Sequence, residues 1–126
     1  MISSSKDPDV GPAAGTLHSY RPDQGHGLPH DPLPSILGPR PIGWISTRSA
    51  AGRINLAPYS FFNVFNYRPP IVAFSSVGYK DTVANAEATG EFVCNLATRD
   101  LAEAMNATST EQPSEHDEFT LAGLTP

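Results

Sequence analysis

The chain has 126 residues, a length that allows one domain. Its formal net charge is −5 and it has no basic stripe, which argues against a nucleic-acid partner. Its single cysteine excludes an internal disulfide, and no apolar run approaches the length of a membrane span. The N-terminal residues lack the apolar segment of a secretory signal, so we expect a cytoplasmic protein that contacts no membrane.

Residues 1–41 contain eight of the 13 prolines and five of the ten glycines, with few large apolar side chains. Such a segment buries too little apolar surface to offset the entropy that is lost on ordering. We therefore expect residues 1–35 to form a disordered or extended arm and residues 36–126 to form the folded domain. Roughly 90 residues make a small core, which oligomerisation would help to stabilise.

The first part of the domain is predicted to be a β-hairpin. β-branched and aromatic residues predict a strand over residues 42–48, a turn follows at 49–52, and residues 53–57 form the returning strand. Because Pro58 cannot donate to a sheet ladder, we expect the returning strand to end or bulge there. Residues 59–65 are then expected to be irregular or to form a short helical turn.

After the hairpin, the sequence predicts a buried strand over residues 71–77 and a helix over residues 82–89. Asp81 is the expected N-cap of this helix, and Gly90 stands where a C-terminal residue with positive φ is expected. A further strand is predicted over residues 91–96.

The last part of the chain is predicted to contain a second helix that ends near Ala107 and a polar loop over residues 108–118. A final turn is expected to pack Phe119, Leu121 and Leu124 against the strands. Several strands with short helices indicate a mainly β fold, in the form of a small barrel with helices at its ends.

The loop over residues 75–82 is the strongest candidate for an anion site. It combines hydroxyl groups, Gly78, Lys80 and the backbone N–H groups of a helix start, which favour phosphate. The alternative is that Asp81 and Thr82 only cap the helix and that Lys80 lies in solvent. Spacing alone leaves both interpretations open, and the chain contains neither a P-loop nor a GxGxxG motif.

The remaining reactive side chains favour neither a nucleophile nor a metal site. Cys94 lies in an apolar strand and is expected to be buried as a small hydrophobic side chain. His18, His26 and His30 fall in the arm and His116 in the acidic loop, which offer no rigid metal geometry. Without the usual acid–base or nucleophilic groups, the reactivity would come from a cofactor.

Four motifs stand in order along the chain: RPIGWIST at residues 40–47, NLAPYSFFN at 55–63, KDT at 80–82 followed by Asn85, and GEFVCNL at 90–96. Together they resemble the flavin reductase-like, FMN-binding split-barrel family, which includes flavoredoxin. The resemblance implies a homodimer that binds FMN near the dimer interface and uses NAD(P)H as co-substrate. It also implies a set of cofactor-binding residues: Ser46, Thr47, Asn55, Leu56, Ala57, Ser60, Ser75, Ser76, Lys80, Asp81, Thr82 and Asn85.

The polar and aromatic groups of residues 55–63 agree with this resemblance, because they would present polar contacts to a flat, partly apolar ligand. Members of the family usually continue with further strands, so the expected fold is a mainly β split barrel that is incomplete at the C-terminus. Three hypotheses follow: an FMN-dependent oxidoreductase, a flavin-binding or electron-carrier protein without a nicotinamide site, and an inactive truncated product.

Overall fold

The computed structural model describes residues 17–110 and 116–126, and the chain divides into two compact units, residues 1–38 and 39–126. In the first unit, the described residues form a short 3-10 helix, Pro22–Gln24 (η1), and one helical turn, Leu33–Ile36 (α1). They bury no side chain. The disordered or extended arm expected over residues 1–35 stays a prediction, and residues 1–16 lie outside the described part.

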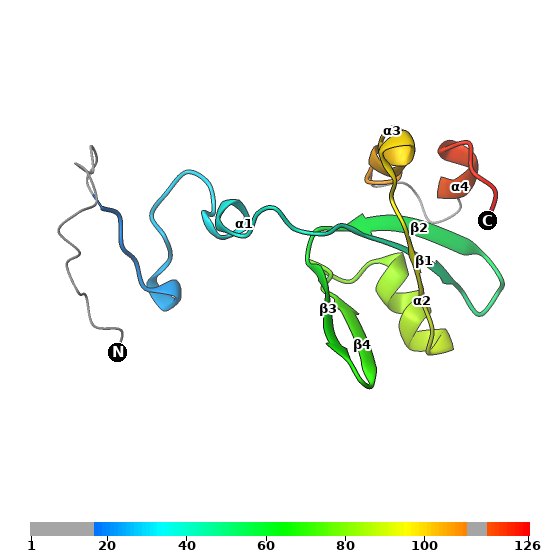
Figure 1. Ribbon diagram of the computed structural model, residues 1–126, viewed down its shortest axis with the longest axis horizontal. Helices are drawn as coiled ribbons and strands as arrows, with labels where there is room; N and C mark the ends of the chain where they lie inside the picture. Colours follow the sequence, from blue (N-terminus) through cyan, green and yellow to red (C-terminus); the bar gives the residue numbers. More distant parts are fainter. Residues whose placement is uncertain (1–16, 111–115) are drawn as a thin grey trace. The chain divides into compact units, whose positions relative to one another are not determined.

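The second unit is built on a three-stranded antiparallel sheet in the order β2-β1-β5 (Figure 1). Its strands are Gly43–Arg48 (β1), Ile54–Tyr59 (β2) and Val93–Asn95 (β5). Gly52 closes the turn between β1 and β2 with a φ of 84°, and its N–H donates to the carbonyl of Ser49 at 2.9 Å. The hairpin and the later strand predicted from the sequence are confirmed, with shifted boundaries.

Strand β2 does not end at Pro58, contrary to the sequence expectation, but continues to Tyr59 and pairs Pro58 with Trp44 of β1. The reason is that β2 lies at the edge of the sheet. The N–H of Leu56 points away from β1 and donates to Glu118 Oε2 at 3.3 Å. Pro58 stands two residues further along, so its missing N–H also falls on the outer edge, where the ladder requires no donor.

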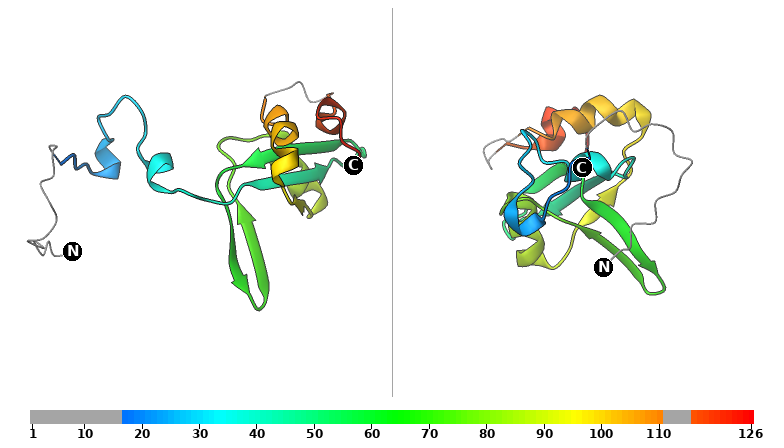
Figure 2. Two further views of the ribbon diagram at one scale, coloured as in Figure 1. Left: turned by 45° about the horizontal axis from the view of Figure 1, so that its top comes forward. Right: turned by 90° about the vertical axis from the view of Figure 1, so that its left-hand side faces the viewer.

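The chain that follows β2 forms a second, two-stranded sheet. Phe62–Tyr67 (β3) pairs antiparallel with Pro70–Phe74 (β4), and this hairpin projects from the rest of its unit (Figure 1 and Figure 2). The prediction of an irregular segment here is therefore wrong. The burial predicted for residues 71–77 is also wrong, because Ile71 is 46% and Val72 is 37% exposed. Among the described strands, none lies beside this hairpin to cover it.

Helices lie on both sides of the three-stranded sheet (Figure 1). Helix α2 contacts β1 and β2 from one side, while α3 and α4 contact β2 from the other. Their bounds, with a short 3-10 helix before α3, are Asp81–Thr89 (α2), Arg99–Leu101 (η2), Ala102–Ala107 (α3) and Glu118–Leu121 (α4). No helix in the described part of the chain is long and apolar enough to cross a membrane.

Helix α2 starts differently from the sequence expectation. Lys80, and not Asp81, occupies the N-cap, and no side chain caps the helix start. Asp81 is the first helical residue. The other end is as predicted, because Gly90 adopts a φ of 75° and its N–H donates to the carbonyl of Ala86 at 2.8 Å.

The hydrophobic core on the α3 and α4 side consists of Trp44, Leu56 and Phe119, with smaller contributions from neighbours that include Leu124. The predicted packing of Phe119 and Leu124 is confirmed. Leu121 is 52% exposed, so its predicted packing is wrong. It lies on the face of the single-turn helix α4 that points away from this core, since Phe119 fills the inward position.

Cys94 is exposed, so its predicted burial is wrong. The reason is that β5 is the second edge strand of the sheet. In the described residues no further strand pairs with its outer side. Partial desolvation still raises the pKa of the Cys94 thiol from its ordinary value of 9.0, which disfavours the thiolate that a nucleophile needs.

Candidate functional site

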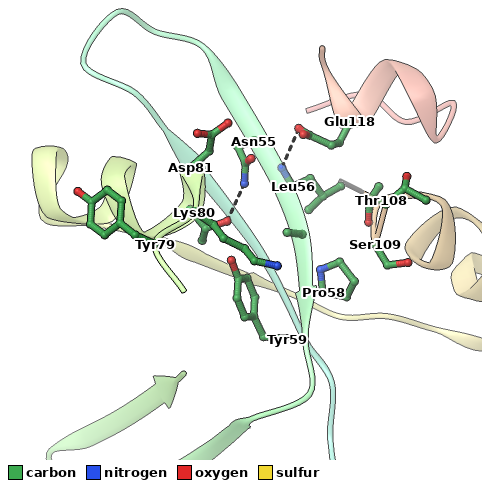
Figure 3. Close-up of a pocket in the computed structure, with 13 residues that line it drawn as sticks. Asn55, Leu56, Pro58, Tyr59, Tyr79, Lys80, Asp81, Thr108, Ser109 and Glu118 are labelled. Carbon is green, nitrogen blue, oxygen red and sulfur yellow. Dashed lines mark hydrogen bonds between the residues drawn. The ribbon is translucent and has the colours of Figure 1, made fainter. Parts of the chain in front are cut away.

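A cavity of about 340 Å³ opens between the outer edge of β2 and the start of α2 (Figure 3). Two motifs that lie far apart in the sequence meet in its wall, one from β2 and one from the loop before α2. These are Asn55, Leu56 and Ala57 on one side, and Lys80, Asp81 and Thr82 on the other. The size falls within the range of small-ligand sites.

Buried hydrogen bonds hold the two motifs together. Asn55 Nδ2 donates to Thr82 Oγ1 at 2.8 Å, and both side chains are buried. Asn85 Nδ2, one turn further along α2, donates to Thr47 Oγ1 of β1 at 3.1 Å. These four side chains fix α2 against the sheet, so their polar groups serve the geometry of the cavity first.

The start of α2 supplies the positive character of the cavity. The first N–H groups of an α-helix have no intrahelical acceptor, and the helix dipole concentrates positive charge there. No side chain caps this start, and Lys80 stands at its N-cap position. A phosphate group would therefore meet backbone donors and an ammonium group at one point of the wall.

Two carboxylates also line the cavity. Glu118 Oε2 accepts the N–H of Leu56 at 3.3 Å, and Asp81 opens the helix. In Figure 3 both carboxylates lie at one end of the cavity, whereas the Lys80 ammonium and the Tyr59 hydroxyl lie at the other. The cavity therefore has an acidic end, which suits hydroxyl donors, and a basic end, which suits an anion.

Tyr59 ends β2 and reaches into the wall at the basic end. It is 7% exposed, and its ring contacts Phe74 with the ring centroids 4.8 Å apart. The Tyr59 hydroxyl is buried and has no hydrogen-bond partner, which holds for no other buried side-chain polar atom in the described residues. An orphaned donor of this kind at the basic end fits a phosphate-bearing ligand.

The structure brings half of the expected site residues into this cavity and distributes the others. Ser75 and Ser76 line a separate depression of about 540 Å³ beside α2, and Ser46 lines another of about 490 Å³ together with Thr47. Ser60 is exposed and lines none of these cavities. The roles of all these residues stay predictions.

Sequence reasoning missed several residues that line the cavity between β2 and α2: Pro58, Tyr59, Tyr79, Thr108, Ser109, Thr110 and Glu118. Pro58 and Tyr59 belong to the NLAPYSFFN motif, so their neighbourhood was visible in the sequence. The residues at the end of α3 and the start of α4 are not, because only the packing of those helices on β2 brings them to the cavity.

A small antiparallel sheet with a polar cavity at a helix start defines a fold that offers a site for a small ligand. The chain belongs to the flavin reductase like domain family, whose model matches residues 37–126. The resemblance seen in the sequence motifs is confirmed by this match. Membership of the family implies a flavin as the ligand.

Related proteins agree with the family. An uncharacterized protein of Aquifex aeolicus is 48% identical over 96 residues, which are 72% of this chain and 49% of the relative. The chain thus spans about half the length of the curated relatives it matches.

Solved structures share the fold. Nitrilotriacetate monooxygenase component B from Bacillus cereus superposes with a TM-score of 0.74 at 30% identity, over 90% of this chain and 58% of that chain. Flavoredoxin of Desulfovibrio vulgaris (Miyazaki F) superposes with a TM-score of 0.67 at 21% identity. The match covers 71% of this chain and 49% of flavoredoxin. The predicted mainly β, split-barrel class is confirmed, and the two sheets are not closed into a barrel.

Proposed function

We propose that the chain binds FMN in the cavity between β2 and α2 and takes part in oxidoreduction with NAD(P)H as electron donor. The observation that carries the proposal is the meeting of the Asn55–Ala57 segment with Lys80 and the uncapped start of α2 in one cavity. Membership of the flavin reductase like family supports a flavin as the occupant. Bound FMN would supply the redox chemistry.

The residues of the chain would bind and orient the cofactor. Lys80 and the N–H groups at the start of α2 would hold the phosphate, since a charge-assisted hydrogen bond is about twice as strong as a neutral one. The outer edge of β2 would face the ring system. The carboxylates of Asp81 and Glu118 would accept hydrogen bonds from the ribityl hydroxyls at the opposite end of the cavity.

Replacing Lys80 tests the phosphate site. A hydrogen bond to a charged group contributes about 1.5–3 kcal/mol, so Lys80→Ala is expected to weaken FMN binding about ten- to a hundredfold. Riboflavin lacks the phosphate, and its affinity is expected to change little. Arg99→Ala, which removes an exposed cation from η2, serves as the matched control for charge. Equal losses for FMN and riboflavin would contradict a phosphate contact.

Consumption of NADH separates an enzyme from a carrier. Purified protein that copurifies with a flavin absorbance spectrum and lowers the NADH absorbance in the presence of FMN is an oxidoreductase. Protein that binds FMN without consuming NADH or NADPH is an electron carrier or a flavin-binding protein. Protein that takes up no flavin contradicts the proposed function.

We propose that the folded unit is a homodimer in the cytoplasm. The hairpin β3–β4 exposes Val64, Phe65 and Tyr67, which are 59%, 71% and 78% accessible. Exposed apolar strands with open edges favour pairing with another copy. Light scattering at micromolar concentration is expected to give twice the chain mass of 13.4 kDa, and a folded monomer would contradict the dimer.

A further inference from the structure

The Tyr59 hydroxyl is unusual because it is buried and unused. Tyr59 is the last residue of β2 and lies at the basic end of the cavity between β2 and α2. It is 7% exposed, and its oxygen has no hydrogen-bond partner. A buried hydroxyl without a partner destabilises the folded protein, and such groups are rare in native structures. A phenylalanine would fill the same space and make the same contact with Phe74 without this penalty.

The other hydroxyl groups that line the cavity are already engaged. Each of them has a partner in the protein: Tyr79 donates to Glu87, Thr82 accepts from Asn55, Thr108 donates to Met105, Ser109 to Asn106 and Thr110 to Ala107. Of the six hydroxyl-bearing residues in the wall, only Tyr59 has a hydroxyl without a hydrogen-bond partner in the protein.

The surroundings of Tyr59 select the kind of ligand group it can serve. Figure 3 shows its hydroxyl at the same end of the cavity as the Lys80 ammonium, with the Asp81 and Glu118 carboxylates at the other end. A phenol in a positive surrounding donates most strongly to an anionic oxygen. The backbone N–H groups at the start of α2, next to Lys80, add a further source of donors in the wall of the same cavity.

We propose that Tyr59 is a specificity-determining residue whose hydroxyl donates a hydrogen bond to the phosphate of the bound flavin and so favours phosphorylated over unphosphorylated flavin. This inference rests on the proposed function, because it takes FMN as the occupant of the cavity. Binding of the phosphate would give the orphaned hydroxyl its partner. The bound phosphate would then recover the free energy that the apoprotein loses by burying the unpartnered hydroxyl of Tyr59.

Tyr59→Phe tests the proposal, because it removes one oxygen and keeps the ring. We expect the affinity for FMN to fall about tenfold and the affinity for riboflavin to stay within about twofold. The apoprotein is expected to melt at the same or a higher temperature, since a buried unpartnered group is removed. Tyr79→Phe is the matched control, because Tyr79 also lines the cavity but its hydroxyl donates to Glu87 at 2.8 Å.

Two results would overturn the assignment of Tyr59 alone. Unchanged FMN affinity in Tyr59→Phe would show that its hydroxyl makes no contact with the phosphate. Equal losses for FMN and riboflavin would show that the phenol acts on the ring system instead.

Titration with inorganic phosphate separates failure of this inference from failure of the proposed function. Suppose that the wild-type protein binds no flavin, and that phosphate protects it, but not Tyr59→Phe, from thermal unfolding. The contact between Tyr59 and an anion would then stand, and the flavin proposal would be overturned. Wild-type protein that binds neither FMN nor phosphate would overturn both.

Discussion

The hydrogen bond between Asn55 and Thr82 is expected to contribute strongly to stability, because both side chains are buried and the N···O distance is 2.8 Å. Thr82→Val keeps the shape of the side chain but leaves the Asn55 amide without its acceptor. A buried donor without a partner costs about 1–3 kcal/mol. In a domain of this size, each kcal/mol lowers the melting temperature by about 4–8 °C, so we expect a fall of roughly 5–20 °C.

Thermal unfolding of the apoprotein, followed by circular dichroism, measures this effect. Thr89→Val is the matched control, because it makes the same change at an exposed position of the same helix. The double variant Asn55→Leu/Thr82→Val is expected to recover part of the loss, since replacing both partners by apolar groups removes the orphaned donor. If Thr82→Val and Thr89→Val melt at the same temperature, the buried hydrogen bond does not hold α2 to β2 and the prediction is refuted.

Three further outcomes are expected. A Cβ at Gly43 would lie 2.5 Å from the Phe62 ring, so Gly43→Ala is expected to cost about 1–3 kcal/mol in urea unfolding, and Phe62→Leu is expected to relieve part of this cost. Cys94 is the only cysteine and its pKa is raised by desolvation, so its alkylation rate is expected to keep rising above pH 9.0. The hydrogen bond to Glu87 raises the pKa of Tyr79. The stabilising effect of this hydrogen bond is therefore present at lower pH and is lost as the pH rises through the raised pKa. Glu87→Ala is expected to lower the pKa of Tyr79 in an ultraviolet titration.

Local signals were enough to predict the β1–β2 hairpin and helix α2. These signals are the β-branched residues of the strands, the turn at Gly52 and the positive φ of Gly90. Each depends only on residues that are close in the sequence. The continuation of β2 through Pro58 was not predictable in this way. Whether a proline interrupts a strand depends on which side of the sheet its missing N–H faces, and that depends on the pairing partners.

The hairpin β3–β4 was missed for a related reason. An apolar run such as residues 71–74 predicts burial, because apolar residues are buried in most domains. Whether another layer covers the run is a property of the assembled molecule. In the described residues no third strand pairs with this hairpin, and Ile71 and Val72 of the run are exposed.

The candidate site was partly visible in the sequence, because its two main motifs are short and local. Their meeting was implied by the family resemblance, but the roles of individual atoms were not. Asn55 and Thr82 join the two motifs by a hydrogen bond, and the buried hydroxyl of Tyr59 has no hydrogen-bond partner. This division follows from burial, and burial is set by the packing of α2 on the sheet.

The outer edge of β2 connects the fold to the proposed binding of a ligand. An edge strand presents free backbone groups to which another strand can add, and such addition would close the cavity. On this edge Pro58 removes one donor, and Glu118 accepts the donor of Leu56. Both residues also line the cavity. The same two features that disfavour strand addition therefore keep the edge open for a small ligand, which explains why a proline is tolerated inside this strand.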